Sequence, residues 1–102
     1  MGYYFWQSVL KNINVSSESI DKALLKGLAN HDTKVIEILY KQHFGLIQSL
    51  IIQNNGSFDD ARDIFQDAMM VLYEKAKDEN FVLTAQVKTY LYSISWRLWL
   101  KK

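Results

Sequence analysis

Proline is absent from this chain of 102 residues, and glycine occurs only four times. These two residues interrupt helices most strongly, so a chain almost without them can form long helices. Nearly half of the residues are hydrophobic, which is enough for one buried core at this length. The composition therefore predicts one compact all-α domain.

Hydrophobic residues recur at helical spacing along the chain, and polar residues stand where each helix is expected to begin. The expected helices span residues 18–28, 33–53, 59–77 and 84–102, and a short aromatic-rich helix is expected within 3–13. We expect a compact bundle of three long helices plus one or two short N-terminal helices. Each of the four longer expected helices is preceded by a residue whose side-chain oxygen can cap a helix start. These residues are Ser16 and Ser17, Asp32, Ser57 or Asp59, and Thr84.

Few kinds of active-site chemistry fit this composition. Cysteine is absent, which excludes disulfides, thiolate metal sites and cysteine nucleophiles. The two histidines, His31 and His43, have no companion ligands, and His43 is expected to be a satisfied core residue. No set of nucleophile, base and orienting residue appears. We therefore expect no catalytic residue, metal, cofactor or enzymatic activity.

The overall charge and the apolar runs limit where the chain can act. Its net charge of +1 is low for a protein that binds duplex DNA through phosphates alone, so any nucleic-acid role must be local or shared with a partner. The first ten residues lack a secretory signal, and no apolar run is long enough to span a membrane. We expect a cytoplasmic protein with no membrane partner.

The helix expected over 59–77 has two opposite faces at about 100° per residue. The core stripe consists of Ala61, Phe65, Ala68, Leu72 and Ala76. The opposite stripe is acidic with an apolar centre, which is typical either of a solvated face or of a docking face for a basic partner helix. In the docking interpretation, Ile64 and Met70 are the apolar anchors. The predicted contact residues are Asp63, Ile64, Gln66, Asp67, Met70 and Glu74.

The last expected helix also has a core stripe, made of Val87, Leu91, Ile94 and Leu98. A second stripe, about 120° around the helix, consists of Lys88, Tyr92, Trp96 and Trp99. Aromatic faces stack unpaired bases, and neighbouring cations hold the phosphate backbone. The alternative is that the two tryptophans pack against the aromatic residues 3–6.

Three runs of sequence carry a resemblance to a known family. The run DARDIFQD at 60–67, with an aromatic at Tyr73, resembles region 2.2 of bacterial sigma factors of the extracytoplasmic-function type. The run VKTYLYSI at 87–94 resembles regions 2.3 and 2.4, and the runs ALLKG at 23–27 and LYKQHF at 39–44 resemble the opening helices. The resemblance covers about residues 17–102, and the order and spacing of the motifs carry it.

The resemblance implies an all-helical region 2 over residues 16–102, after an N-terminal extension over 1–15. It implies that the acidic stripe docks on a coiled coil of the β′ subunit of RNA polymerase core. The loop 78–84 and the last helix would capture flipped bases of the non-template strand at the promoter −10 element. The implied roles are base bonding for Asn80, a pocket wall or loop anchor for Phe81, and phosphate contacts for Lys88 and Arg97. The residues expected to bind DNA are Asn80, Phe81, Lys88, Tyr92, Trp96, Arg97, Trp99 and Lys101.

Two features depart from the family pattern. Trp96 and Arg97 stand where the family usually has arginine and asparagine, so a residue-by-residue promoter code does not transfer to this chain. Region 4, which reads the −35 element, is absent, and the last helix is still periodic at Lys102, which indicates a native chain that continues. An anti-sigma factor is a further expected partner. The competing hypothesis is a helical protein-interaction module, such as an adaptor or regulator without DNA binding.

Overall fold

The computed structural model describes residues 17–78, 80–83 and 86–102. Over these residues the chain forms helices α2 (Ser17–Ala29), α3 (Thr33–Gln53), α4 (Phe58–Ala76) and α5 (Val87–Leu100), and no strand. The predicted all-α class is therefore confirmed for this part of the chain. Only α3 and α4 are long, with 21 and 19 residues, because α5 has 14 residues and is almost as short as α2. The helix expected within 3–13 lies outside the described residues.

The corner between α2 and α3 is tight. His31 N–H donates to the Leu28 carbonyl at 3.0 Å, and Asp32 N–H donates to the Gly27 carbonyl at 2.9 Å. This paired bonding ends a helix and requires His31 to adopt a left-handed conformation, with φ of 58°. The Asp32 carboxylate then accepts a 3.0 Å bond from Lys34 N–H and so begins α3, as predicted.

The turn between α3 and α4 also follows from local sequence. Asn55, with φ of 73°, ends α3 in the left-handed region that asparagine tolerates better than most residues. The Ser57 hydroxyl accepts a bond from Asp60 N–H at 3.1 Å, and the Asp60 carboxylate accepts one from Ser57 N–H at 2.9 Å. Ser57, and not Asp59, is therefore the N-cap of α4. The bond that the Asp60 carboxylate accepts from Ser57 N–H lowers the pKa of Asp60, and a side-chain hydrogen bond from Ser57 lowers it further.

The start of α5 differs from the prediction. The N-cap position is Gln86, whose side chain makes no capping bond, and the predicted cap Thr84 lies outside the described residues. Instead, the Asp21 carboxylate of α2 accepts a 3.1 Å bond from Val87 N–H, the first amide of α5. A carboxylate satisfies an unpaired amide here and also complements the helix dipole. A residue 66 positions away thus fixes where α5 begins.

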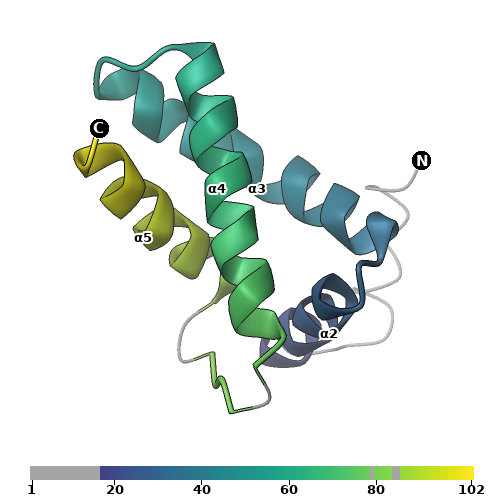
Figure 1. The fold of residues 1–102 in the computed structure, drawn as a ribbon. Coiled ribbons are helices and arrows are strands. Elements are labelled where there is room, and N and C mark those ends of the chain that lie inside the picture. The colour runs from purple at the N-terminus through teal and green to yellow at the C-terminus, as the bar shows by residue number, and fades with distance from the viewer. Residues whose placement is uncertain (1–16, 79, 84–85) are drawn as a thin grey trace.

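Helix α4 lies at the centre of the bundle and packs against α2, α3 and α5. Figure 1 shows α4 crossing in front of α3, with α5 on one side and α2 below. Phe65 is fully buried and meets the rings of Tyr40 and Phe44 edge-on, with centroids 5.1 and 5.4 Å away. The predicted stripes are confirmed as core: Ala61, Phe65, Ala68, Leu72, Val87, Leu91 and Ile94 are buried, and Ala76 and Leu98 pack against them half-buried.

Candidate functional site

The adjoining helices α4 and α5 carry opposite charge. Helix α4 has five carboxylates against two cations, Arg62 and Lys75. Residues 87–102 have four cations and no acidic residue: Lys88, Arg97, Lys101 and Lys102. The chain as a whole is almost neutral. Its negative charge is concentrated on α4 and its positive charge on residues 87–102, so the two charges lie on neighbouring surfaces.

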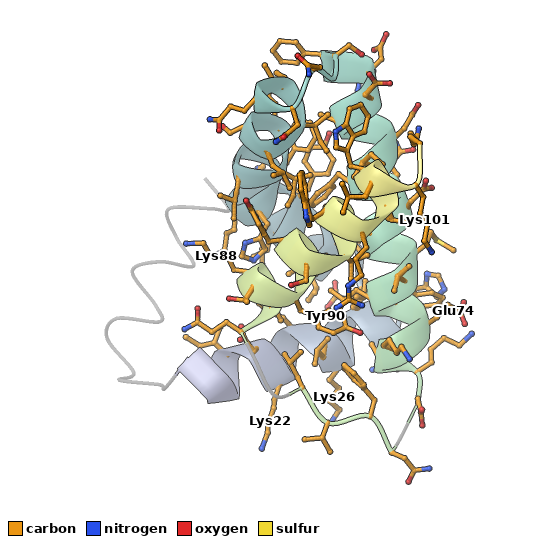
Figure 2. All side chains as sticks on the ribbon, turned by 90° about the vertical axis from the view of Figure 1, so that its left-hand side faces the viewer. Lys22, Lys26, Glu74, Lys88, Tyr90 and Lys101 are labelled. Carbon is orange, nitrogen blue, oxygen red and sulfur yellow. The ribbon has the colours of Figure 1, made fainter. Side chains whose placement is uncertain are left out.

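The predicted docking face of α4 is open to solvent, apart from one residue. Its exposed members, which we call the acidic strip, are Asp63, Gln66, Asp67, Met70 and Glu74. Met70 has an exposed fraction of 57%, which is high for a large apolar side chain. Glu74 lies on the outer side of α4 (Figure 2) and is 3.9 Å from Lys77 Nζ, an exposed pair that contributes little to stability.

The prediction that Ile64 is a docking anchor is wrong. Its side chain is only 1% exposed and belongs to the hydrophobic core. The helical wheel treated α4 as a helix with a single neighbour, whereas α4 packs against three helices. A helix covered from three sides buries a wider stripe, and Ile64 lies within it.

The first part of the loop between α4 and α5 is held by hydrogen bonds to Asp78 and by a ring contact with α5. Asp78 Oδ1 accepts a 2.9 Å bond from Asn80 N–H, and the Asp78 carbonyl accepts a 3.0 Å bond from Phe81 N–H. Phe81 is half-buried, and its ring meets the Tyr90 ring edge-on at 5.7 Å, so Phe81 anchors the loop on α5. The Asn80 side chain is exposed. Val82, for which the sequence predicted no role beyond its place in this loop, is 75% exposed and lies beside these residues.

The surface of α5 keeps most of the predicted strand-binding residues exposed. Two exposed groups flank α5: Lys88 with Tyr92 and, about half a turn around the helix, Arg97 with Lys101, which follows α5. We call these four residues together the basic face of α5. Figure 2 shows Lys88 and Lys101 at opposite ends of the helix. Tyr92 is 39% exposed and lies one turn after Lys88 on α5.

The two tryptophans of α5 are half-buried, so they do not form the exposed stacking surface that the sequence predicted. Both pack against the core, and Trp99 Nε1–H donates to the Asn54 carbonyl at 3.2 Å. A Cβ built on Gly56 would lie only 2.9 Å from Trp99 Cη2, so this glycine makes room for the indole. Trp99 thus joins the end of α5 to the α3–α4 turn. The alternative, packing against residues 3–6, lies outside the described residues.

His43 lies on α3 where α2 and α5 approach it, and it is not the satisfied core histidine that was expected. Its Nδ1 is buried and has no hydrogen-bond partner in the described part of the chain. Burial lowers the pKa of His43, and Lys88 lowers it further, against the opposing effect of the Asp21 carboxylate. The imidazole is therefore neutral at pH 7.

Lowering the pH should reduce the stability of the fold, because His43 becomes protonated more readily in the unfolded chain. Unfolded histidine has a pKa of about 6.5, and the pKa of His43 in the folded chain is lower. The unfolded chain binds this proton first, so the free energy of unfolding should fall as the pH drops from about 6.5 towards the folded value. The pKa of Glu37, lowered by its bond from Lys41, and the lowered pKa of Asp60 lie below the ordinary carboxyl range, so both groups stay ionised near pH 6.5.

Urea denaturation at several pH values between about 7 and 5 tests this expectation. The substitution His43→Gln removes the titrating group and should flatten the profile in this window. If the variant keeps the wild-type slope, the pH dependence arises elsewhere in the chain.

Over residues 17–78, 80–83 and 86–102, no three His, Cys, Asp or Glu side chains gather as a metal site requires. None of the described helices combines the length and apolar character needed to cross a membrane. The chain matches no family model, no curated protein and no solved structure. The functional argument therefore rests on the charges and exposed side chains of α4, the loop and α5.

Proposed function

We propose that this chain is a sigma region 2 domain that acts in transcription initiation in the bacterial cytoplasm. The acidic strip of α4 docks on the basic coiled coil of the β′ subunit. The loop 78–83 and the basic face of α5 hold the non-template strand of the −10 element. The observation that carries the proposal is the separation of charge between α4 and α5. A basic partner protein binds a negatively charged surface, whereas a nucleic-acid strand binds a positively charged one.

The docking part of the proposal depends on how the acidic strip is built. Met70 is an exposed apolar side chain in the middle of the strip, and Asp63, Gln66 and Asp67 lie before it on the same helix. Interfaces gain most of their affinity from a central apolar anchor, whereas surrounding charges set register and speed association. Ile64 and the core stripe hold α4 in place under this surface.

The strand-binding part of the proposal depends on fewer side chains than the docking part. Lys88 and Arg97 would hold phosphates, and the exposed part of Tyr92 would stack on a base. Asn80 presents its side chain from a loop that Phe81 fixes to α5 through Tyr90. So few cations give weak binding by the isolated domain, and docking on polymerase would add the missing affinity by raising the local concentration of the strand.

The substitution Asp67→Lys should weaken binding to RNA polymerase core by about 1–3 kcal/mol, because it reverses a charge in the acidic strip. Asp67 is exposed, so the fold should remain intact. Glu37→Lys is the matched control, since it makes the same charge change at an exposed position on α3. Binding of each variant to core polymerase is measured by surface plasmon resonance. Equal binding by Asp67→Lys and Glu37→Lys would show that the acidic strip is not the docking surface.

A fluorescently labelled −10-type single strand tests the basic face of α5, with and without core polymerase. We expect weak binding by the isolated domain, and a fall in affinity with salt of about 0.7 log units per log unit of salt for each phosphate contact. Lys88→Ala and Arg97→Ala should each reduce strand binding, whereas Lys34→Ala, at an exposed position on α3, should not. Equal strand binding by all three variants would remove α5 from the DNA interface.

A helical protein-interaction module without DNA binding is the second candidate. The partial burial of Trp96 and Trp99 favours it, because Tyr92 is the most exposed aromatic residue left on α5. The two candidates differ in their partner. A sigma domain must bind core polymerase, whereas an unrelated adaptor would leave core polymerase unbound in the plasmon-resonance assay.

A further inference from the structure

Two methionines are neighbours on α4, and the fold exposes them to different degrees. Met69 is half-buried and packs against the hydrophobic core, whereas Met70 is more than half exposed on the acidic strip. The chain has three methionines and no cysteine, so no thiol of the same chain competes for an oxidant. The third methionine, Met1, lies outside the described residues. Met70 is therefore the most exposed sulfur-containing side chain in the described part of the chain.

The charges around Met70 favour its reaction with an uncharged oxidant. Asp67 and Glu74 lie three residues before it and four residues after it, so both stand within about one turn on the same side of α4. Glu74 is on the outer side of the helix in Figure 2. A thioether sulfur that donates an electron pair to a peroxide oxygen becomes more positive as the bond forms, and neighbouring carboxylates stabilise this charge. The same carboxylates repel an anionic oxidant but not a neutral peroxide.

Oxidation would alter the apolar centre of the acidic strip. Methionine sulfoxide is polar, whereas the thioether of Met70 is the apolar group that a docking partner would cover. Covering a polar group without giving it a hydrogen bond costs free energy, so the oxidised strip should bind a partner more weakly. Met70 is not part of the hydrophobic core, so the fold should remain intact.

We propose that Met70 is a methionine-oxidation site and that its conversion to the sulfoxide by a peroxide weakens docking of the acidic strip. One oxygen of hydrogen peroxide forms a bond to the Met70 sulfur, the O–O bond breaks, and the other oxygen leaves as water with both hydrogens. The sulfur loses two electrons and the peroxide gains them. Methionine sulfoxide reductases reverse the change, as two thiols are oxidised to a disulfide and the oxygen leaves as water. The oxidation site is independent of the proposed function, whereas its effect on docking rests on that function.

Peptide mass spectrometry tests the oxidation site. The chain is treated with dilute hydrogen peroxide, and fragment ions follow the sulfoxide at Met69 and at Met70 over time. In the folded chain we expect Met70 to be oxidised about three- to tenfold faster than Met69, because susceptibility follows exposure. In concentrated urea the two neighbours should react at nearly equal rates, since unfolding exposes both. Equal rates in the folded chain, or faster oxidation of Met69, would overturn the site.

Surface plasmon resonance with core polymerase tests the effect on docking. Oxidised wild-type chain should bind about tenfold more weakly than the reduced chain, and treatment with methionine sulfoxide reductases and a thiol should restore its binding. Met69→Leu is the matched control and should lose affinity on oxidation as the wild-type chain does. Met70→Leu has no thioether at position 70, so peroxide should leave its affinity, whatever its starting value, unchanged.

The outcomes separate this inference from the proposed function. If the reduced chain binds core polymerase and full oxidation of Met70 leaves that binding unchanged, the effect on docking is rejected and the proposed function stands. If the reduced chain does not bind core polymerase but Met70 is still oxidised first, the oxidation site stands. In that case the proposed function is rejected, together with the effect on docking that rests on it.

Discussion

Replacing Phe65 with alanine should lower the free energy of unfolding by about 3–5 kcal/mol. Phe65 is fully buried at the centre of the bundle. The substitution removes its apolar area and leaves a cavity that the surrounding helices cannot fill. It also removes the edge-on contacts with the rings of Tyr40 and Phe44. Such ring contacts stabilise a fold by more than the buried apolar area alone accounts for.

Urea denaturation of purified variants measures this loss, and Met70→Ala is its matched control. Both residues are large and apolar and lie on α4, but Met70 is 57% exposed. Its truncation should change the free energy of unfolding by about 0.5 kcal/mol or less, while it weakens binding to core polymerase. If both variants lose the same stability, the core and outer faces of α4 have been assigned wrongly.

The substitution Gly27→Ala should destabilise the fold by about 1–3 kcal/mol. A Cβ at this position would lie 3.1 Å from Val35 Cβ and closer still to Val35 Cγ2. The β-branched Val35 side chain has few rotamers in a helix, and it sits in the first turn of α3, so it cannot easily move away. The absence of a side chain at Gly27 therefore permits the close approach of α2 and α3.

Gly45→Ala should have the opposite effect. Gly45 lies inside α3, and a Cβ built there meets no atom of the described chain within 4 Å. Alanine should therefore stabilise the chain by up to about 1 kcal/mol through its higher helix propensity. Thermal denaturation of both variants measures the contrast. Effects of the same sign would contradict the close packing of α2 on α3.

Much of the fold could be predicted from local sequence. The bounds of α3 agree with the prediction because Asp32 supplies its cap and Asn54 begins the polar stop after it. Helix α4 begins after Ser57 for the same kind of reason, since Ser57 and Asp60 satisfy each other's backbone amides. The core stripes of α4 and α5 followed from helical periodicity, which depends only on the spacing of apolar residues.

The candidate site was predicted less completely. The exposed carboxylates and Met70 of α4 are where the helical wheel put them, because they lie opposite the core stripe. Lys88, Tyr92 and Arg97 are likewise exposed. Their exposure, though not their role, could be predicted because it follows from the position of each residue on its own helix relative to the core stripe.

Tertiary structure decided the remaining features, because each depends on residues that are distant in the sequence. Ile64 is buried since three helices surround α4, and Trp99 is half-buried since the α3–α4 turn offers it a carbonyl and a glycine. The start of α5 is set by Asp21, 66 positions earlier. Periodicity and capping patterns are local, so the sequence by itself determined the middle helices and their core faces. Only packing between helices determined the extent of the buried stripe, the cap of α5 and the burial of His43 Nδ1.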